Sequence, residues 1–331
     1  MPEVAILLLE NCQPSAVFTV IEALCVANFI ATTINRNSDP AFSWRRASLD
    51  GRPVRAMCGV SLSADCSATE LGKPDLLFAP AIDIPEPHTI TRTIQRLESQ
   101  WGGLLRRHHE KDGYVAANCS ATFLLAEAGL LNGKQATTSW WLAGMFRRQY
   151  PEVELLPDLV VKDTRIFSAA AYSAVLNLAL EIISEFLGPQ SMLPCARVML
   201  IDANRTQQLP YADLAMQIEH GDALVLQGQT LLLKHVRNPP DVAGLAARLH
   251  VTSRTLERRF KKAIGQTPLE YLQSSRIENT KRLLATTHLS LEQIADRVGY
   301  GNPGSLRRVF VREAGVSPST YRRSFAVGRR V

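Results

Sequence analysis

Two short segments near the C-terminal end carry arginines at helical spacing. In the first, Leu256 and Phe260 lie four residues apart and would face a core. The outward face would then consist of Arg254, Glu257, Arg258 and Lys261. In the second segment, Ser305 and Arg308 would face outward, with Arg307 and Arg312 beside them. Arginine can hydrogen-bond guanine O6 and N7 together, so both faces could read base edges in a major groove. The alternative for each arginine is a phosphate contact or a solvated charge.

The elements that would position these side chains form a repeat. Leu245–Val251 and then Arg254–Phe260 read as two helices joined by a turn, and Ile294–Tyr300 followed by Ser305–Phe310 repeats the pattern. Ala246 and Ala295 are 49 residues apart, while Phe260 and Phe310 are 50 apart, so the second turn is one residue longer. Thr252 or Ser253 could cap the first outer helix, and Asn302 with Pro303 could start the second. Two such units in tandem can place two helices in successive major grooves.

The charge of the chain is segregated. Residues 240–331 contain 17 Lys and Arg against 7 Asp and Glu, a net charge of +10. The remaining residues contain 20 Lys and Arg against 24 Asp and Glu, a net charge of −4. The two parts add to the overall net charge of +6. A basic C-terminal part joined to a slightly acidic remainder predicts double-stranded DNA as a partner of the C-terminal part alone.

The cysteines and the N-terminus predict a cytoplasmic protein. The six cysteines show no C-x-x-C or Cys/His spacing, so the sequence indicates neither a metal site nor a disulfide framework, and no cofactor is expected. The first ten residues contain one short apolar run without a basic segment before it, which is typical of a buried strand. We expect reduced thiols and no membrane-spanning segment.

Apolar runs alternate with helical patterns over the first 190 residues. Strands are expected at 4–9, 42–48, 75–78, 114–117 and 159–161, and helices at 17–30, 90–109, 121–128, 140–148 and 174–187. This alternation predicts an α/β domain with an open, mostly parallel, flavodoxin-like sheet over residues 1–190. A helical linker region is expected over 191–239, and Asn238-Pro239-Pro240 marks the start of an all-α domain over 240–326. Its helix-turn-helix units are predicted at about 242–262 and 291–312.

One cysteine occupies a position typical of a nucleophile. The segment Tyr114-Val-Ala-Ala-Asn-Cys119-Ser120, followed by Ala121-Thr-Phe-Leu-Leu-Ala126, predicts a strand, a tight turn and a helix. A thiol at a helix N-terminus should have a lowered pKa, and the arrangement is that of a nucleophile elbow. The backbone N–H groups of Ala81 and Ser120 could line an anion pocket beside it.

The C-terminal segments resemble the AraC/XylS family of transcription regulators. The resemblance rests on S-R-T-L-E-R-R-F-K (253–261), G-Q-T-P-L-E-Y-L (265–272), I-A-D-R-V-G-Y (294–300) and G-V-S-P-S-T-Y-R (315–322). It implies two helix-turn-helix units joined by a long helix at about 269–286. It also implies base contacts from Arg254, Glu257 and Arg258 in the first unit, and from Gly304, Ser305 and Arg308 in the second. Because Pro303 and Gly304 offer little to a base edge, we expect the first unit to dominate specificity.

The segment from Cys119 to Trp140 resembles the PfpI-like branch of the class I glutamine amidotransferase superfamily, and in particular the sensor domains of GlxA-type AraC regulators. The catalytic members carry a histidine after Thr-Thr, where this chain has Ser139, and the loop Asn11–Ser15 lacks the expected acidic residue. Without a base, the thiol lacks what covalent catalysis requires. We therefore expect no catalytic residues and a vestigial nucleophile at Cys119.

A small-molecule effector should then bind outside the carboxyl ends of the strands. The expected pocket residues are Asn11, Ala81, Ile82, Cys119, Ser120, Ser139 and Trp140. Trp140 and Trp141 could hold a cation, and the resemblance implies an amino acid or a quaternary amine. The prediction is a homodimeric, sequence-specific regulator that contacts RNA polymerase if it activates. An active cysteine amidase- or lyase-like enzyme fused to a DNA-binding domain, and a Cys119 redox sensor, are the alternatives.

Overall fold

The apolar runs of the N-terminal part become the strands of one sheet, because each is too short for a helix and is covered on both faces. The computed structural model describes all residues except 35–38, 85–88, 203–205, 212–221 and 327–331. The described chain divides into two units, Met1–Gln208 and Leu209–Val331, which are described separately below.

The central sheet of the first unit has seven strands among the described residues. In spatial order they are β10 (Val160–Asp163), β11 (Ile166–Ala169), β7 (Tyr114–Asn118), β6 (Leu76–Ala79), β1 (Glu3–Leu7), β2 (Ser43–Ser48) and β5 (Cys66–Ser67). Every neighbouring pair is parallel except β10 and β11. Two short ribbons accompany the sheet, β3 (Val54–Arg55) with β4 (Ser61–Leu62) and β8 (Gln135–Ala136) with β9 (Glu154–Leu155). The α/β class and the mostly parallel sheet are confirmed.

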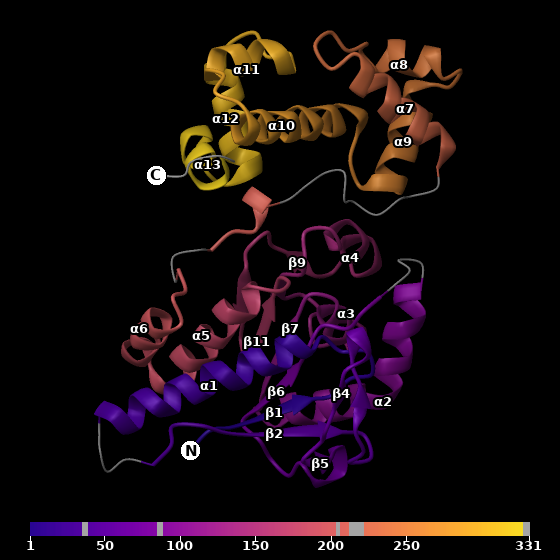
Figure 1. Ribbon diagram of the computed structural model, residues 1–331. Coiled ribbons are helices and arrows are strands. Elements are labelled where there is room, and N and C mark those ends of the chain that lie inside the picture. Colours follow the sequence, from indigo (N-terminus) through magenta and orange to yellow (C-terminus); the bar gives the residue numbers. More distant parts are fainter. Residues whose placement is uncertain (35–38, 85–88, 203–205, 212–221, 327–331) are drawn as a thin grey trace. The chain divides into compact units, whose positions relative to one another are not determined.

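Helices cover both faces of this sheet (Figure 1). The helices are α1 (Pro14–Ile34), α2 (Ile90–Glu110), α3 (Ala121–Glu127), α4 (Ala143–Gln149), α5 (Ala174–Leu187) and α6 (Pro189–Val198). The connection from β1 to β2 and the one from β6 to β7 run in opposite directions along the sheet. Since parallel crossovers are right-handed, α1 and α2 must cover opposite faces. Helix α1 packs with α5 and α6, and α2 packs with α3.

Helix α1 has the length and composition of a membrane span, with a mean hydropathy of 1.8 over Pro14–Thr33. Its inward residues Val17, Val20 and Leu24 are fully buried, whereas Phe18 and Phe29 are 42% and 62% exposed. Core helices of soluble domains have the same length and hydropathy. In this structure the apolar face of α1 packs against α5 and α6.

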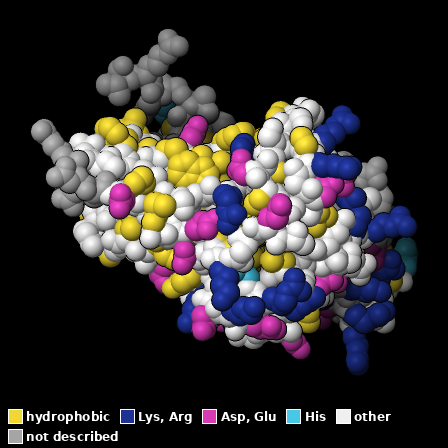
Figure 2. Space-filling model, turned by 90° about the horizontal axis from the view of Figure 1, so that it is seen from below, with side chains coloured by type: hydrophobic (Ala, Val, Ile, Leu, Met, Phe, Trp, Pro, Cys, Tyr) yellow, Lys and Arg dark blue, Asp and Glu magenta, His cyan; other side chains and the backbone are white. Residues whose placement is uncertain are grey.

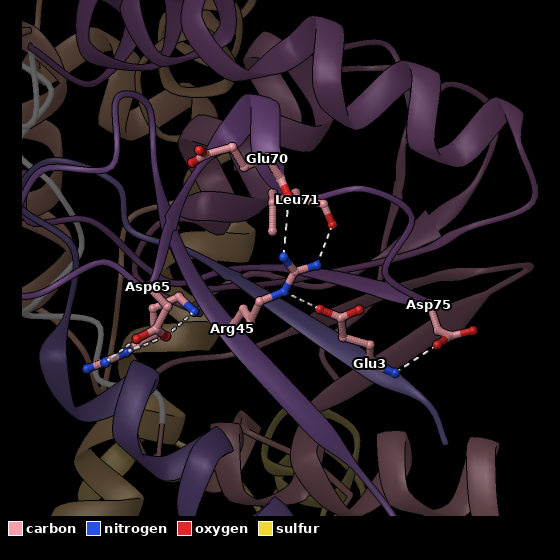
Figure 3. Close-up of polar contacts among 7 residues, drawn as sticks. Glu3, Arg45, Asp65, Glu70, Leu71 and Asp75 are labelled. Carbon is pink, nitrogen blue, oxygen red and sulfur yellow. Dashed lines mark hydrogen bonds and ion pairs between the residues drawn. The ribbon is translucent and has the colours of Figure 1, made fainter.

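Arg45 on β2 joins the edge of the sheet to neighbouring segments (Figure 3). Its guanidinium donates to the Glu3 carboxylate, to the Glu70 carbonyl at 3.3 Å and to the Leu71 carbonyl at 2.6 Å. Asp75 in turn accepts the backbone N–H of Glu3 at 2.7 Å. Polar side chains thus fasten β1 and β2 to the loop that leads into β6.

The second unit is helical. Its helices are α7 (Ala223–Lys234), α8 (Val242–Arg248), α9 (Ser253–Ile264), α10 (Pro268–Thr286), α11 (Leu291–Val298), α12 (Pro303–Ala314) and α13 (Pro318–Phe325), with a 3₁₀ turn at Leu209–Tyr211. Two hydrophobic clusters share α10, one around Phe260 and the other around Phe310. Figure 1 shows α10 running between the two groups of helices. The predicted long helix at about 269–286 is therefore α10.

The predicted helical linker at 191–239 does not form a separate region. Helix α6 packs on α1 and α5 of the first unit, while α7 packs on α9 and α10 of the second. Residues 203–205 and 212–221 of the predicted linker lie outside the described residues. The boundary between the units falls at Gln208, later than the predicted end of the first domain at 190. Buried side chains that join these helices to distant elements, such as Cys195 in α6 and Val225 in α7, explain the difference.

Candidate functional site

The first helix-turn-helix consists of α8, a turn and α9. Ala246 and Leu256 are buried where the two helices meet. His250 adopts a left-handed backbone in the turn with φ of 56°, and Thr252 caps α9 by accepting the Thr255 N–H at 3.2 Å. All four predicted residues on the outer face of α9 are exposed, namely Arg254, Glu257, Arg258 and Lys261. The turn and the cap therefore fix the angle at which this face is presented.

The second helix-turn-helix consists of α11, a turn and α12. Gly299 takes the left-handed place of His250, with φ of 85°, and a side chain there would meet the Val236 carbonyl at 2.7 Å. Asn302 caps α12 by accepting the Ser305 N–H at 2.7 Å. Arg307 and Arg308 are exposed and Ser305 is half-buried. The two copies thus share one architecture.

The predicted DNA-reading residues differ in how far they are already engaged. Lys261 pairs with Glu270 at 2.9 Å, and Glu270 is itself part of the capping box of α10. Arg308 makes only a long contact of 3.5 Å with the Ser305 hydroxyl. Arg254 and Arg258 make no hydrogen bond or ion pair with the described part of the chain. Arg254 and Arg258 are therefore available to an external partner, whereas the Lys261 ammonium already pairs with the Glu270 carboxylate.

Helix α7, which lies within the predicted linker, packs against α9 of the first helix-turn-helix. Asp222 caps α7 and also accepts two hydrogen bonds from Arg259 of α9, at 2.6 Å and 2.9 Å. Gly228 of α7 lets α7 and α9 approach closely, since a Cβ added there would lie 2.9 Å from the Phe260 ring of α9. The cap could have been predicted from the sequence, because Asp is a preferred capping residue. The ion pair could not, because its partner Arg259 lies 37 residues away.

We expect Asp222→Ala to lower the free energy of unfolding of the second unit by about 1–2 kcal/mol, because the helix cap and the ion pair are both lost. Arg259 lowers the pKa of Asp222 below its ordinary value by hydrogen bonding. The stabilisation is therefore complete above the ordinary pKa of an aspartate and disappears as the pH falls through the lowered value. Urea unfolding of the wild type and of Asp222→Ala measures this contribution. The two free energies of unfolding should differ at pH 7 and should converge as the pH is lowered. Asp222→Asn, which can still cap, should lose less at pH 7.

Cys119 sits in a nucleophile elbow in the first unit. It follows β7 directly, has φ of 53°, and precedes α3. Its thiol accepts the Ser139 hydroxyl at 2.8 Å, and its carbonyl accepts the Thr138 hydroxyl at 2.7 Å. The predicted strand, turn and helix are confirmed. Ser139 is fully buried beside the sulfur, at the position where the catalytic relatives implied by the resemblance carry a base.

The predicted low pKa of Cys119 is wrong. Burial raises the pKa of this thiol, and the hydrogen bonds from Ser139 and Ser120 offset only part of the effect. The sulfur lies in a nearly closed environment, since the residue is 8% exposed. Desolvation of the thiolate outweighs the dipole of the short helix α3. The thiol is therefore protonated at neutral pH.

Of the two backbone N–H groups predicted to line an anion pocket beside Cys119, those of Ala81 and Ser120, the first is already bonded within the chain. The Ala81 N–H donates to the Asn118 side chain at 2.9 Å, and the Ile82 N–H donates to the Ser120 hydroxyl at 2.9 Å. The Ser120 hydroxyl in turn donates to the Ile82 carbonyl at 2.8 Å. An oxyanion needs free donors, and the Ala81 N–H of the predicted pair is already used, as is the neighbouring Ile82 N–H.

A cavity of about 150 Å³ lies over Cys119. Its lining includes four of the seven predicted pocket residues, Ala81, Ile82, Cys119 and Ser120. Asn11, Ser139 and Trp140 are not among the lining residues. The remaining lining is Gln13, Met57, Asp83, Ile84, Trp141, Leu142 and Tyr172. Trp141 takes the place predicted for Trp140, whose ring packs edge-on against it at 5.3 Å.

Gln208 holds the segment that forms one wall of this cavity. Its side-chain amide donates to the Thr138 carbonyl at 2.8 Å and to the Thr137 hydroxyl at 3.1 Å, and its oxygen accepts the Trp140 N–H at 2.8 Å. Gln208 is 5% exposed and is the last residue of the first unit. The sequence did not predict this role of Gln208, because its partner Trp140 lies 68 residues away and no local pattern connects the two.

We expect Cys119 to resist alkylation in the native protein. All six cysteines are free thiols; Cys25 and Cys58 are exposed, whereas Cys12 and Cys119 are buried. Burial raises the pKa of Cys12 to about 12 and raises that of Cys119 as well. Iodoacetamide at pH 7.5 should label Cys25 and Cys58 first, with Cys119 labelled only after unfolding, as followed by peptide mass analysis. Labelling of Cys119 at the rate of Cys25 would contradict its protonated, buried state.

Comparison with known proteins agrees with both parts of this geometry. The DJ-1/PfpI family matches residues 3–185, and a helix-turn-helix domain matches residues 245–324. The chain belongs to the DJ-1/PfpI family. In addition, it carries the AraC-type helix-turn-helix domain that its C-terminal motifs predicted.

Relatives share this arrangement over most of the chain. It is 28% identical to the HTH-type transcriptional regulator CdhR of Pseudomonas aeruginosa, over 91% of this chain and 89% of that protein. It is 24% identical to the HTH-type transcriptional regulator GlxA of Rhizobium meliloti, over 73% of this chain and 70% of that protein. A putative transcriptional regulator from Vibrio parahaemolyticus superimposes with a TM-score of 0.52 at 18% identity, over 60% of this chain and 98% of that one. The predicted GlxA-type architecture is thus confirmed, and the solved structure supports the fold.

Proposed function

We propose that the protein is a sequence-specific, DNA-binding transcription regulator. The observation that carries the proposal is the pair of capped outer helices, α9 and α12, each with exposed arginines. The helices contribute base contacts through the major groove, and the net charge of +10 over 240–331 attracts the phosphate backbone. The regulators named above share both domains with this chain. We further propose that it acts as a homodimer in the cytoplasm and contacts RNA polymerase if it activates.

The test is selection of duplexes from a random pool by the full chain, followed by affinity measurements on the selected duplex and on a scrambled one. Specific regulators prefer their sites by about 10³-fold or more. A preference of this size supports the proposal. Equal affinity for both duplexes, or no binding, would overturn it.

We also propose that the first unit senses a small cationic or zwitterionic metabolite in the cavity over Cys119. The lining offers the Asp83 carboxylate and the aromatic rings of Trp141 and Tyr172, and it contains no Lys or Arg. A carboxylate with aromatic faces favours an amino acid or a quaternary amine. The wall that contains Trp141 and Leu142 is tied to Gln208, where the second unit begins. A ligand that shifts this wall would thus also shift Gln208, the last residue of the first unit.

A thermal-shift screen of the full chain against amines and amino acids tests the sensing proposal, since a ligand stabilises the folded state by mass action. A compound that raises the melting temperature of the wild type should no longer raise that of Asp83→Asn. If a hit binds equally well to Asp83→Asn and to a Trp141→Ala variant, the cavity is not the site.

Catalysis and redox sensing by Cys119 are less well supported than ligand sensing. Both need a reactive thiolate, whereas this thiol has a raised pKa, a serine partner and no free oxyanion donors from Ala81 and Ile82. Turnover of an amide substrate that disappears in Cys119→Ala would establish the enzyme alternative. Peroxide sensitivity of DNA affinity that disappears in Cys119→Ser would establish the redox alternative.

Figure 2 shows one face of the molecule, on which the charge is mixed. Acidic, basic and apolar side chains are interspersed there, with Lys and Arg most frequent toward the right-hand side. A mixed surface gives no strong field of one sign.

A further inference from the structure

A basic cavity in the second helix-turn-helix lies beside the predicted base-reading face. Its volume is about 440 Å³. The lining residues are Leu284, Leu291, Arg307, Pro318, Ser319, Arg322 and Arg323. Three of these seven residues are arginines, and none is acidic. A cavity with several guanidinium groups and no carboxylate selects for an anion.

The arginines are not neutralised by the protein. Arg307 and Arg323 are exposed and make no hydrogen bond or ion pair with the described residues. Arg322 is half-buried and donates to the Leu289 carbonyl, yet its Nε atom is buried with no partner in the described part of the chain. A buried guanidinium N–H without an acceptor is unfavourable, so the chain leaves part of the hydrogen-bonding capacity of Arg322 unused.

Comparison of the two repeats shows that the basic cavity is a feature of the second copy. The helices after the two units align as P-L-E-Y-L-Q (268–273) and P-S-T-Y-R-R (318–323). At the same step of 50 residues, Arg307, Arg322 and Arg323 correspond to Glu257, Leu272 and Gln273. Leu272 is 3% exposed and packs in the cluster around Phe260. The first copy thus forms the same helices with no arginine at any of these three positions.

Backbone groups add positive potential to the cavity. Leu291 is the first residue of α11, and Pro318 and Ser319 are the first two residues of α13. Helix N-termini carry partial positive charge, which adds to the charge of the three arginines. The apolar floor of Leu284, Leu291 and Pro318 limits solvent screening of these interactions.

We propose that this cavity binds a backbone phosphate of the DNA that α12 contacts. In helix-turn-helix proteins the second helix lies in the major groove while the first crosses the strand backbone. Here the cavity lies between the start of α11, the first helix of the unit, and Arg307 on the flank of α12. The phosphate strand that borders the groove would pass over it. This inference rests on the proposed function, and it adds Arg322 and Arg323 to the DNA contacts.

The second copy would thus mainly fix position, and the first copy would mainly read sequence. Phosphate contacts set the register of a protein on a duplex but carry no direct sequence information. This division fits Pro303 and Gly304, which give the start of α12 no side chain that can hydrogen-bond a base.

The test uses the full chain with Arg323→Gln, and with Arg307→Gln and Arg323→Gln combined, on a selected and a scrambled duplex. Arg322 is left intact because it also donates to Leu289. We expect the double variant to bind both duplexes roughly tenfold more weakly, by the same factor on each. The slope of log affinity against log salt should decrease by about 1. Arg92→Gln, an equal charge change on α2 of the first unit, is the control and should leave both affinities unchanged. Unchanged thermal unfolding of the variants would show that they fold.

Three results would overturn the inference. The double variant could bind both duplexes as the wild type does. It could lose affinity only for the selected duplex, which would make the arginines base-reading. Finally, calorimetry could show that inorganic phosphate binds the wild type but not the variant while duplex affinity is unchanged, which would assign the cavity to a soluble anion. Failure of the wild type to prefer the selected duplex would instead count against the proposed function, since the loss on the scrambled duplex can still be measured.

Discussion

Phe310→Ala should lower the free energy of unfolding of the second unit by about 3–5 kcal/mol, the loss typical of removing a buried phenylalanine. Phe310 is fully buried on α12 and lies in the cluster with Leu306, Ile294 and Tyr321. Its ring meets the Tyr321 ring edge-on at 5.6 Å. Because this cluster joins α11, α12 and α13, we expect the variant to lose most of its preference for a selected duplex. Urea unfolding and duplex titration measure the two effects.

Val311→Ala is the matched control for the stability measurement. Val311 follows Phe310 on the same helix but is 42% exposed, so its truncation should change the free energy of unfolding by no more than about 0.5 kcal/mol. A similar loss in both variants would mean that α12 is sensitive to any truncation, and that Phe310 has no special place in the core.

Arg258→Ala should weaken binding to a selected duplex by about 1–3 kcal/mol, or roughly five- to 150-fold, with a much smaller effect on a scrambled duplex. Arg258 is exposed on the outer face of α9 and has no hydrogen bond or ion pair with the described residues. It is therefore free to hydrogen-bond a guanine edge. A repeated selection with the variant should relax the sequence at one base pair.

Lys262→Ala provides the comparison on the same helix, since Lys262 is also exposed. We expect it to weaken both duplexes alike, as a phosphate contact does. We expect Arg308→Ala, on α12, to relax specificity less than Arg258→Ala does. Equal losses for Arg258→Ala on both duplexes would reassign Arg258 to the phosphate backbone.

The sequence predicted elements well where the signal is local. The long helix expected at about 269–286 is α10 (Pro268–Thr286), and the helix expected at 174–187 has those bounds. Capping by Thr252 and Asn302 was also readable, because a capping side chain bonds a backbone N–H three residues ahead. Strand β11 (Ile166–Ala169) was missed. Its four residues are too few to show a period, and its place between β7 and β10 depends on pairing with residues far along the chain.

The candidate sites divide in the same way. The outer face of α9 follows from a period of 3.6 residues, so the exposure of Arg254 and Arg258 could be predicted from the sequence. Cys119 and Ser120, which lie on one turn, both line the cavity, whereas the lining contains Trp141 in place of the expected Trp140. Which of two adjacent tryptophans faces a cavity depends on the packing of the other, and that is not a local property.

The sequence by itself determined the tandem repeat, the helix ends and the segregation of charge, because these arise from interactions among neighbours in the chain. Only the tertiary structure decided the chemistry of the sites. It buried Cys119 and so raised the pKa of its thiol, and it directed the Ala81 N–H to Asn118. It also brought Arg307 of α12 and Arg323 of α13 to one cavity. Desolvation and the convergence of distant side chains depend on what packs around a group, and that is fixed only when the whole unit has folded.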